Sequence, residues 1–311
     1  MRAKGSALAW VLIIMLILGI AWYLGWINFQ LPSSITRPTE TTTEREKVSL
    51  ELPVELVLVD AIGGGSLNPS SIKLYQGTKL METLTPSGGT ATSSLPYRSG
   101  EKLTAIIVWS SNIFYAVDIT VPYYDQYQVQ VAPSTHKVKL ELVQPPSSLT
   151  VKAYDQVGNA ISSEVNITGS GSITVSVIND NANTGLPAPF YYPVTQTTYN
   201  NYLVIKIEGS TNAVPQISGA TLIYQTNGLA VYIVELDRLI CETNPVTGAT
   251  EPAIQSLALS IDGTGLEGNS YTMTITAYAD ADLSYMQKAM GTVNADAVSL
   301  GTISFTVNIQ S

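Results

Sequence analysis

The feature that most limits the fold of this chain is a regular alternation of short apolar segments and turns from residue 49 onward. The segments are rich in Val, Ile, Thr and Tyr, which favour an extended, pleated backbone. Gly, Pro and Asn interrupt them at intervals of about 8 to 12 residues, and these residue types accept the backbone angles of a chain reversal. Many short strands at this spacing are typical of β-sandwiches and barrels, so we predict an all-β fold for this part of the chain.

The segments divide into two groups, which predict two β-sandwich or jelly-roll-like domains. The small sandwich would occupy residues 49–132, with strands at 52–59, 71–75, 90–94, 103–109, 114–121 and 127–131. The larger sandwich or jelly roll would occupy residues 133–311, with strands at 137–143, 149–154, 173–178, 203–207, 221–224, 230–236, 256–261, 272–277 and 302–309.

Two segments near the C-terminus allow more specific predictions. The last strand alternates cleanly, and one of its faces carries Ile303, Phe305, Val307 and Ile309, which predicts a buried C-terminal strand. The segment 282–291 has a helical pattern that begins at Asp282 and ends at a glycine. We expect this helix to cover one end of the larger sandwich.

The order of strands and turns in residues 52–122 resembles the transthyretin-like or carboxypeptidase-regulatory β-sandwich. The likeness is carried by Val59-Asp60 before a glycine loop, by the segment 72–77, by Gly88-Gly89 and by the segment 96–100. These are turn and strand patterns rather than a chemical motif. The resemblance implies a sandwich fold with a spacer or adhesion role, and no catalytic residue carries over from it.

The N-terminal segment 7–29 is apolar throughout, and no charged residue occurs between Lys4 and Arg37. A helix over residues 7–28 would be long enough to cross the hydrocarbon core of a bilayer, since each residue adds 1.5 Å. Aromatic rings prefer the membrane interface and basic residues the cytoplasmic side, so the leader 1–6 is expected in the cytoplasm and the C-terminal part outside the cell or on the equivalent side of a virion membrane. The residues assigned to the membrane anchor are Trp10, Trp22, Tyr23 and Trp26.

Two kinds of cleavage compete with an uncleaved anchor. A secretory signal peptide has a shorter apolar core and small residues at its end, whereas bulky aromatic residues end this one. Cleavage in front of the apolar run is the other alternative, because Arg2-Ala3-Lys4-Gly5-Ser6 resembles the leader of archaeal type IV pilins, which is cut after the glycine. That resemblance implies a filament subunit whose freed helix packs in the filament core. The tryptophans and Pro32 suit such a long continuous helix poorly.

The composition of the region between the apolar segment and the sandwiches indicates its role. The net charge of the chain limits its possible partners. Residues 29–48 combine Pro, Ser and Thr with mixed charge and no apolar periodicity, which indicates a spacer. The formal net charge is −9, and the part beyond the apolar segment carries −11 because Arg2 and Lys4 are the only charges before residue 37. This charge would repel nucleic acid, so we expect no nucleic-acid partner.

Residues that commonly carry catalysis are scarce in this chain. His136 is the only histidine and lies at a domain junction where we expect it to face solvent, and Cys241 is the only cysteine and lies in an apolar run that predicts burial. A disulfide within the chain, a zinc site and a catalytic triad are therefore not expected. Glycoside hydrolysis by a pair among Glu267, Asp280 and Asp282 is a minor hypothesis.

Acidic and amide-rich turns at 179–183, 262–269 and 280–282 could supply oxygen ligands for calcium. None of them matches the EF-hand spacing, and loop Asp and Asn residues more often form Asx turns. We therefore expect no cofactor and no metal ion, and we expect that the protein is not an enzyme.

Two surface features remain. The segment 186–193 is stiffened by prolines and rich in aromatic residues, which lose little entropy on docking, so it is a candidate partner contact. The alternative is that it folds over its own sandwich. The acceptor sequence Asn166-Ile167-Thr168 predicts an exposed glycosylation site at Asn166, and Tyr123, Tyr124 and Tyr127 are expected between the two sandwiches. The candidate contact residues are Phe190, Tyr191, Tyr192 and Tyr199.

These features predict a membrane-anchored, non-catalytic structural or interaction protein of a cell envelope or virion surface. It would serve as a spike, a stalk or a linker between membrane and shell, and its partners would be the lipid bilayer and either other proteins or further copies of itself. The first alternative is a pilin-like filament subunit cleaved after Gly5. The second is a tethered hydrolase or solute-binding receptor, which would need a deep pocket with convergent polar groups.

Overall fold

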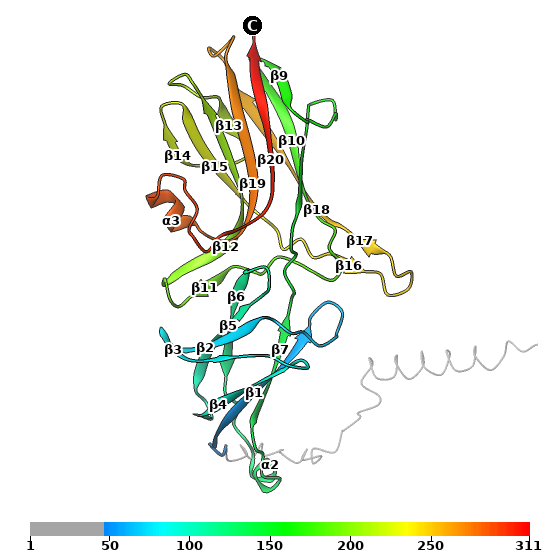
Figure 1. Ribbon diagram of the computed structural model, residues 1–311, viewed down its shortest axis with the longest axis vertical. Coiled ribbons are helices and arrows are strands. Elements are labelled where there is room, and N and C mark those ends of the chain that lie inside the picture. Colours follow the sequence, from blue (N-terminus) through cyan, green and yellow to red (C-terminus); the bar gives the residue numbers. More distant parts are fainter. Residues whose placement is uncertain (1–46) are drawn as a thin grey trace, which may run out of the picture. The chain divides into compact units, whose positions relative to one another are not determined.

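The computed structural model describes residues 47–311, in which nearly every regular element is a β-strand (Figure 1). The prediction of an all-β fold is confirmed for this part of the chain. The predicted membrane helix at 7–28 lies outside the described residues. Within residues 47–311, none of the helices has the length and apolar character needed to cross a bilayer.

The first sandwich is formed by two sheets that enclose one hydrophobic core, which includes Leu56, Leu74 and Ile107. One sheet has the order β4-β1-β7, and the other has the order β3-β2-β5-β6. The strands are β1 (Glu51–Asp60), β2 (Ser71–Gln76), β3 (Lys79–Leu84), β4 (Thr90–Arg98), β5 (Lys102–Val108), β6 (Phe114–Thr120) and β7 (His136–Leu142). The sequence prediction missed β3, the second strand of a tight hairpin with β2.

Strand β7 corrects the predicted domain boundary at residue 132. The sequence placed the strand 137–143 at the start of the larger sandwich, but β7 pairs in parallel with β1 of the first sandwich, with Leu58 opposite Leu140. Leu140 and Leu142 are buried in the core of the first sandwich. A parallel pair joins segments that are distant in sequence, so the local pattern of either strand does not reveal the pairing.

The predicted strand 127–131 is a short helix, α2 (Gln126–Gln130). The alternation of Tyr127, Val129 and Val131 favoured a strand, but a capping box starts a helix here. The Asp125 carboxylate accepts from the Gln128 amide, and the Gln128 side chain accepts from the Asp125 amide. This pair satisfies two donors that a helix start leaves open, and it outweighs the weak β pattern of five residues.

The second sandwich also has two sheets around one core, which includes Val175, Ile205 and Ile275. One sheet has the order β13-β18-β10-β8, and the other has the order β14-β15-β12-β19-β20-β9, with β11 paired to β12. The strands are β8 (Thr150–Tyr154), β9 (Glu164–Thr168), β10 (Ser170–Asn179), β11 (Phe190–Tyr192), β12 (Thr197–Gly209), β13 (Gln216–Ser218), β14 (Thr221–Thr226), β15 (Leu229–Glu235), β18 (Ala253–Asp262), β19 (Ser270–Asp282) and β20 (Val298–Gln310). A small hairpin consists of β16 (Glu242–Thr243) and β17 (Thr250–Glu251).

The two C-terminal predictions are confirmed. Strand β20 lies between β19 and β9, and its side chains Phe305, Val307 and Ile309 are buried in the core. Helix α3 (Leu283–Lys288) starts where predicted, because the Asp282 carboxylate accepts a hydrogen bond from the Tyr285 amide. Cys241 is buried, as its apolar run predicted.

Candidate functional site

The two sandwiches exchange core residues where they meet. Ile113, in the turn between β5 and β6 of the first sandwich, is fully buried among the core residues of the second. In the other direction, Phe190 of β11 and Tyr199 of β12 belong to the hydrophobic cluster of the first sandwich. Each sandwich therefore supplies part of the packing of the other, and we call this contact the junction.

Four aromatic rings form the apolar centre of the junction. The Phe114 ring centroid lies 5.6 Å from that of Phe190, 4.9 Å from that of Tyr192 and 5.7 Å from that of Tyr199. Tyr199 lies 5.8 Å from Phe190 and 5.2 Å from Tyr192. The tilted and edge-on arrangements are the ones that aromatic quadrupoles favour, and each such pair typically adds about 0.5–1.5 kcal/mol to the effect of burial.

The structure thus brings three of the four candidate contact residues together inside the molecule. Phe190 and Tyr199 are buried, Tyr192 is half-buried, and only Tyr191 has more than half of its surface exposed, at 55%. The exposed Tyr191 stays a candidate for contact with a partner. Sequence reasoning missed Ile113 and Phe114, although two large apolar neighbours after a turn must point to opposite sides of a strand and so cannot share one core.

A buried carboxylate forms the polar part of the junction. Asp280 Oδ2 accepts a hydrogen bond of 2.8 Å from the Phe114 amide, while Oδ1 has no hydrogen-bond partner among residues 47–311. The Asp280 backbone is left-handed, with φ of 57°, and its carbonyl accepts from the Asn294 side-chain amide at 3.0 Å. Asn294 Oδ1 in turn accepts from the Asp282 amide at 2.8 Å, so this residue fixes the irregular end of β19.

The protonation of Asp280 should make the stability of the junction depend on pH. Burial raises the pKa of this carboxyl well above its usual range, the Asp296 carboxylate adds to the increase, and the Phe114 amide opposes it. Because the folded state then holds the proton more tightly than the unfolded chain, the free energy of unfolding falls as pH rises from the usual aspartate range through the folded-state pKa.

We expect Asp280→Asn to remove this dependence, since Asn accepts the same amide hydrogen bond and tolerates a left-handed backbone. Relative to the wild type, the variant should gain stability as the pH is raised from about 4 to about 8 in urea unfolding measurements. Asp262→Asn is the control: hydrogen bonds from Thr264 lower the pKa of Asp262, so its stability relative to wild type should change only below about pH 4 and stay nearly constant between about pH 4 and 8. A difference between Asp280→Asn and wild type that is constant with pH would contradict the assignment.

Hydrogen bonds to Tyr115 of β6 also hold the chain segment that connects the sandwiches. The Tyr115 hydroxyl donates to the Val143 carbonyl at 3.0 Å and accepts from the Val143 amide at 3.1 Å. Tyr115 is buried, and desolvation raises the pKa of its hydroxyl. The connection after β7 is therefore held by side-chain bonds in addition to the aromatic packing.

His136, the only histidine of the chain, is fully buried, so the prediction that it faces solvent was wrong. Its ring stacks on Tyr124, with centroids 5.4 Å apart, and Nδ1 lies 3.0 Å from the Tyr124 hydroxyl. Nε2 lies 2.9 Å from the Tyr97 carbonyl oxygen, which can only accept, so Nε2 carries the proton. His136 is the first residue of β7, and its buried side chain serves in packing.

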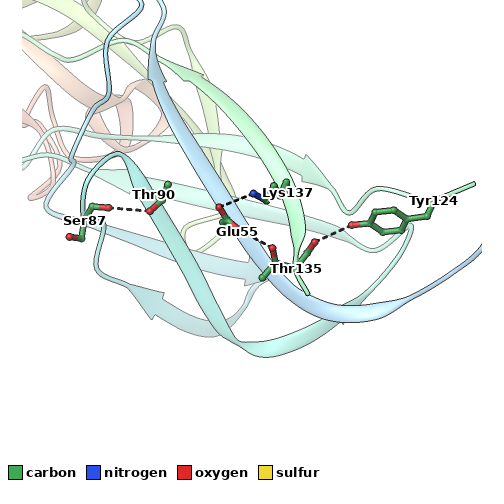
Figure 2. Close-up of polar contacts among 6 residues, drawn as sticks. All are labelled: Glu55, Ser87, Thr90, Tyr124, Thr135 and Lys137. Atoms are coloured by element: carbon green, nitrogen blue, oxygen red, sulfur yellow. Dashed lines mark hydrogen bonds and ion pairs between the residues drawn. The ribbon is translucent and has the colours of Figure 1, made fainter. Parts of the chain in front are cut away.

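Polar contacts around the first residues of β7 attach the end of the segment 121–135 to the first sandwich (Figure 2). Glu55 of β1 accepts from the Thr135 hydroxyl at 2.9 Å and lies 3.7 Å from the Lys137 ammonium. The Tyr124 hydroxyl lies 3.3 Å from the Thr135 carbonyl oxygen. The prediction that Tyr123, Tyr124 and Tyr127 lie between the sandwiches was wrong, because Tyr124 packs on His136 and Tyr127 is 75% exposed.

Of the acidic residues considered for catalysis, Glu267 lies far from the other two, Asp280 and Asp282. Glu267 precedes β19 and Asp280 lies near its end, so the strand rise of about 3.3 Å per residue separates them by roughly 40 Å. Paired carboxylates of glycoside hydrolases lie within about 10 Å of each other. In the described part of the chain, no three His, Cys, Asp or Glu side chains are grouped so that they could hold a metal ion.

The acidic turns considered for calcium have local structural roles. Asp262 accepts from the Thr264 amide at 3.0 Å in an Asx turn, and Asp282 caps α3. The Asn179 side-chain amide is buried and donates to the Leu239 carbonyl at 2.8 Å. These hydrogen bonds give Asp262, Asp282 and Asn179 local partners within the fold.

Asn166 lies on the edge strand β9 with its side chain exposed. Its Oδ1 accepts from the Asn308 side-chain amide at 3.1 Å. The edge position leaves one side of the strand open to solvent, so the predicted glycosylation of Asn166 stays a prediction with a sterically accessible acceptor.

Comparison with known proteins gives remote likenesses only. The sequence matches no protein-family model and no curated protein. Among solved structures, similarity is found to the major pilin subunit of Bacillus cereus, with 8% identity, a TM-score of 0.31, and coverage of 84% of this chain and 70% of that one. A three-domain backbone pilin of Streptococcus pyogenes gives 11% identity, a TM-score of 0.34, and coverage of 83% and 64%. The shaft pilin of Lactobacillus rhamnosus gives 12%, 0.23, and coverage of 84% and 98%.

Proposed function

We propose that this chain is a membrane-anchored, non-catalytic structural or interaction protein of a cell envelope or virion surface. The observation that carries the proposal is the exchange of core residues at the junction, where Ile113 packs in one sandwich and Phe190 and Tyr199 pack in the other. Two sandwiches joined only by a linker would move independently, whereas shared cores resist bending. A stalk or spike requires such stiffness.

The chemistry of the described residues agrees with a mechanical role. The single histidine is a packing residue, Glu267 lies far from the other two candidate acids, and one of these, Asp280 at the junction, bonds to a backbone amide. By contrast, the contact between the two sandwiches is specific and well packed. Under this proposal the second sandwich meets neighbouring subunits or a target, and Tyr191 is its candidate contact residue.

Membrane attachment through residues 7–28 is the second part of the proposal, and it rests on the long uncharged apolar segment with its terminal aromatic residues. An uncleaved anchor would hold the folded part through the spacer that precedes β1. The alternative, a filament subunit, is supported by Lys4-Gly5 directly before the apolar segment. The two alternatives differ in the mature N-terminus.

The native protein, isolated from its source membranes, tests this function by two measurements. Intact mass should show a chain that begins at Met1 or the next residue, and the protein should leave the membrane fraction only in detergent. A chain that begins at Ser6 would support the filament subunit instead. A soluble species that lacks the first 28 residues would overturn the membrane-anchored function.

A further inference from the structure

A stripe of exposed apolar side chains runs along the segment that carries α2. Tyr123 is 48% exposed, and Tyr127 and Val131 are each 75% exposed. Tyr127 and the C-cap residue Val131 are four residues apart, the spacing at which side chains share one side of a helix, and Tyr123 lies two residues before the N-cap Asp125. We call them the α2 stripe.

The backbone beneath the stripe is firmly held. The capping box of Asp125 and Gln128 fixes the start of α2. Tyr124 stacks on the buried His136 at the base of the segment. Gly100, with φ of 88°, leaves room for the Tyr123 hydroxyl, which would contact any added Cβ there. A preorganised apolar surface loses little conformational entropy when it docks.

The stripe lies where the chain enters the described fold. The Val48 amide donates to the Tyr124 carbonyl at 2.8 Å, and the Tyr124 amide donates to the Val48 carbonyl at 3.2 Å, so the described chain begins beside the segment that carries α2. The apolar segment ends at Phe29, which leaves 17 residues before Lys47. Even fully extended, this spacer would reach about 60 Å, and a flexible coil is much shorter on average.

The chemistry of the stripe suits the layer between water and hydrocarbon. Between Asp125, whose carboxylate caps the helix, and Lys137, the segment has Gln, Tyr, Val, Ala, Pro, Ser, Thr and the buried His136, but no Asp, Glu, Lys or Arg. Tyrosine rings with polar tips are enriched at membrane interfaces, where one end is apolar and the other is wet.

We propose that the α2 stripe docks on the headgroup layer of the bilayer in which residues 7–28 are anchored. The inference rests on the proposed membrane anchor and adds a second contact, which would set the height and tilt of the first sandwich. Because the anchor keeps the stripe at a high effective concentration near the lipid, a weak apolar contact is sufficient. The spacer then acts as a tether rather than as a rigid stalk.

The full chain, reconstituted into phosphatidylcholine and phosphatidylglycerol vesicles, provides the test. A fluorophore is attached at Gln130→Cys, an exposed position of α2, or at Val246→Cys, a 91% exposed control on the turn between β16 and β17. Native Cys241 is buried, so it should react little. Lipids with a spin label near the headgroup should quench the Gln130 fluorophore at least about twofold more than the Val246 fluorophore.

The stripe itself is then removed in the Gln130→Cys chain by Tyr127→Ser and Val131→Ser, which should abolish the excess quenching. Tyr191→Ser and Val246→Ser form the matched control, because they remove an exposed tyrosine and an exposed valine elsewhere and should leave the quenching unchanged.

Three results would overturn the inference, and they are distinguishable. Equal quenching at both positions in a chain that stays with the vesicles would exclude lipid docking while the membrane anchor stands. A chain that does not stay with the vesicles would refute the proposed anchor itself. Disulfide-linked dimers of the unlabelled Gln130→Cys chain, formed on oxidation and without excess quenching in the labelled chain, would show that a second copy of the chain covers the stripe.

Discussion

Removal of residues 298–311 will leave the second sandwich unable to fold. Strand β20 lies inside its sheet, where it pairs with β19 on one side and with β9 on the other. Four of its side chains are buried, namely Leu300, Phe305, Val307 and Ile309. Burial of each such side chain typically contributes about 1.5–3 kcal/mol, so together they approach the net stability of about 5–15 kcal/mol of a whole domain.

The loss of hydrogen bonds would add to the loss of apolar burial. Without β20, the inner edges of β19 and β9 expose unpaired amide and carbonyl groups, and β9 has no other partner strand in its sheet. We expect a chain that ends at residue 297 to lack the cooperative unfolding transition of the second sandwich and to aggregate. Circular dichroism during heating and size-exclusion chromatography measure these two effects.

Two controls separate this effect from a general sensitivity of the C-terminus. Removal of Ser311 alone leaves every strand intact, and Ser304→Ala alters a side chain on the exposed face of β20. Each should change the free energy of unfolding by no more than about 0.5 kcal/mol. If the second sandwich of the chain ending at residue 297 still unfolded cooperatively, the central position of β20 in the sheet would be contradicted.

The second large effect is expected from Tyr199→Ala at the junction. Tyr199 is 1% exposed, its ring contacts three other aromatic rings, and its hydroxyl donates to Asp296 Oδ2 at 3.0 Å. Truncation of a buried aromatic side chain typically costs about 3–5 kcal/mol, because the cavity that it leaves collapses only in part. Urea unfolding of residues 47–311 measures the loss.

Two further variants separate the contribution of the Tyr199 hydroxyl from that of its ring and provide a control. Tyr199→Phe keeps the ring and removes the hydrogen bond to Asp296, so we expect a loss of about 1 kcal/mol. Tyr191→Ala is the control on the neighbouring strand, since Tyr191 is 55% exposed, and its effect should stay within about 0.5 kcal/mol. Losses of equal size from Tyr199→Ala and Tyr191→Ala would refute the packing role of Tyr199.

The number of unfolding transitions gives a further readout of the junction. Because the two sandwiches share core residues, we expect residues 47–311 of the wild type to unfold in one transition. Tyr199→Ala weakens the coupling, so its two sandwiches should begin to unfold at different urea concentrations. Two separate transitions in the wild type would contradict the rigid two-sandwich unit on which the proposed function rests.

Local patterns in the sequence were sufficient for most of the strands. The β20 strand was recognised because its apolar residues alternate, and the structure buries the same face. Helix α3 was recognised because an N-cap residue precedes it, and Asp282 caps it. Both signals are properties of a few consecutive residues and are independent of what packs against them.

The candidate site was harder to predict. Phe190 and Tyr199 were identified as important aromatic residues, but they were assigned to a partner surface, whereas they pack against Phe114 of the first sandwich. A local sequence pattern does not indicate which apolar residues pack together when they are some 80 positions apart in the chain. The conversion of the predicted strand 127–131 into α2 also depended on one pair of side-chain hydrogen bonds, between Asp125 and Gln128.

The sequence alone determined that residues 47–311 form strands, where most of those strands lie and that the C-terminal strand is buried, because alternation and turn residues act over short distances. Only the tertiary structure decided that β7 belongs with β1, that His136 is buried and that the two sandwiches share their cores. These outcomes depend on parallel pairing and on packing between distant segments, and the free energies of such contacts depend on both partners together.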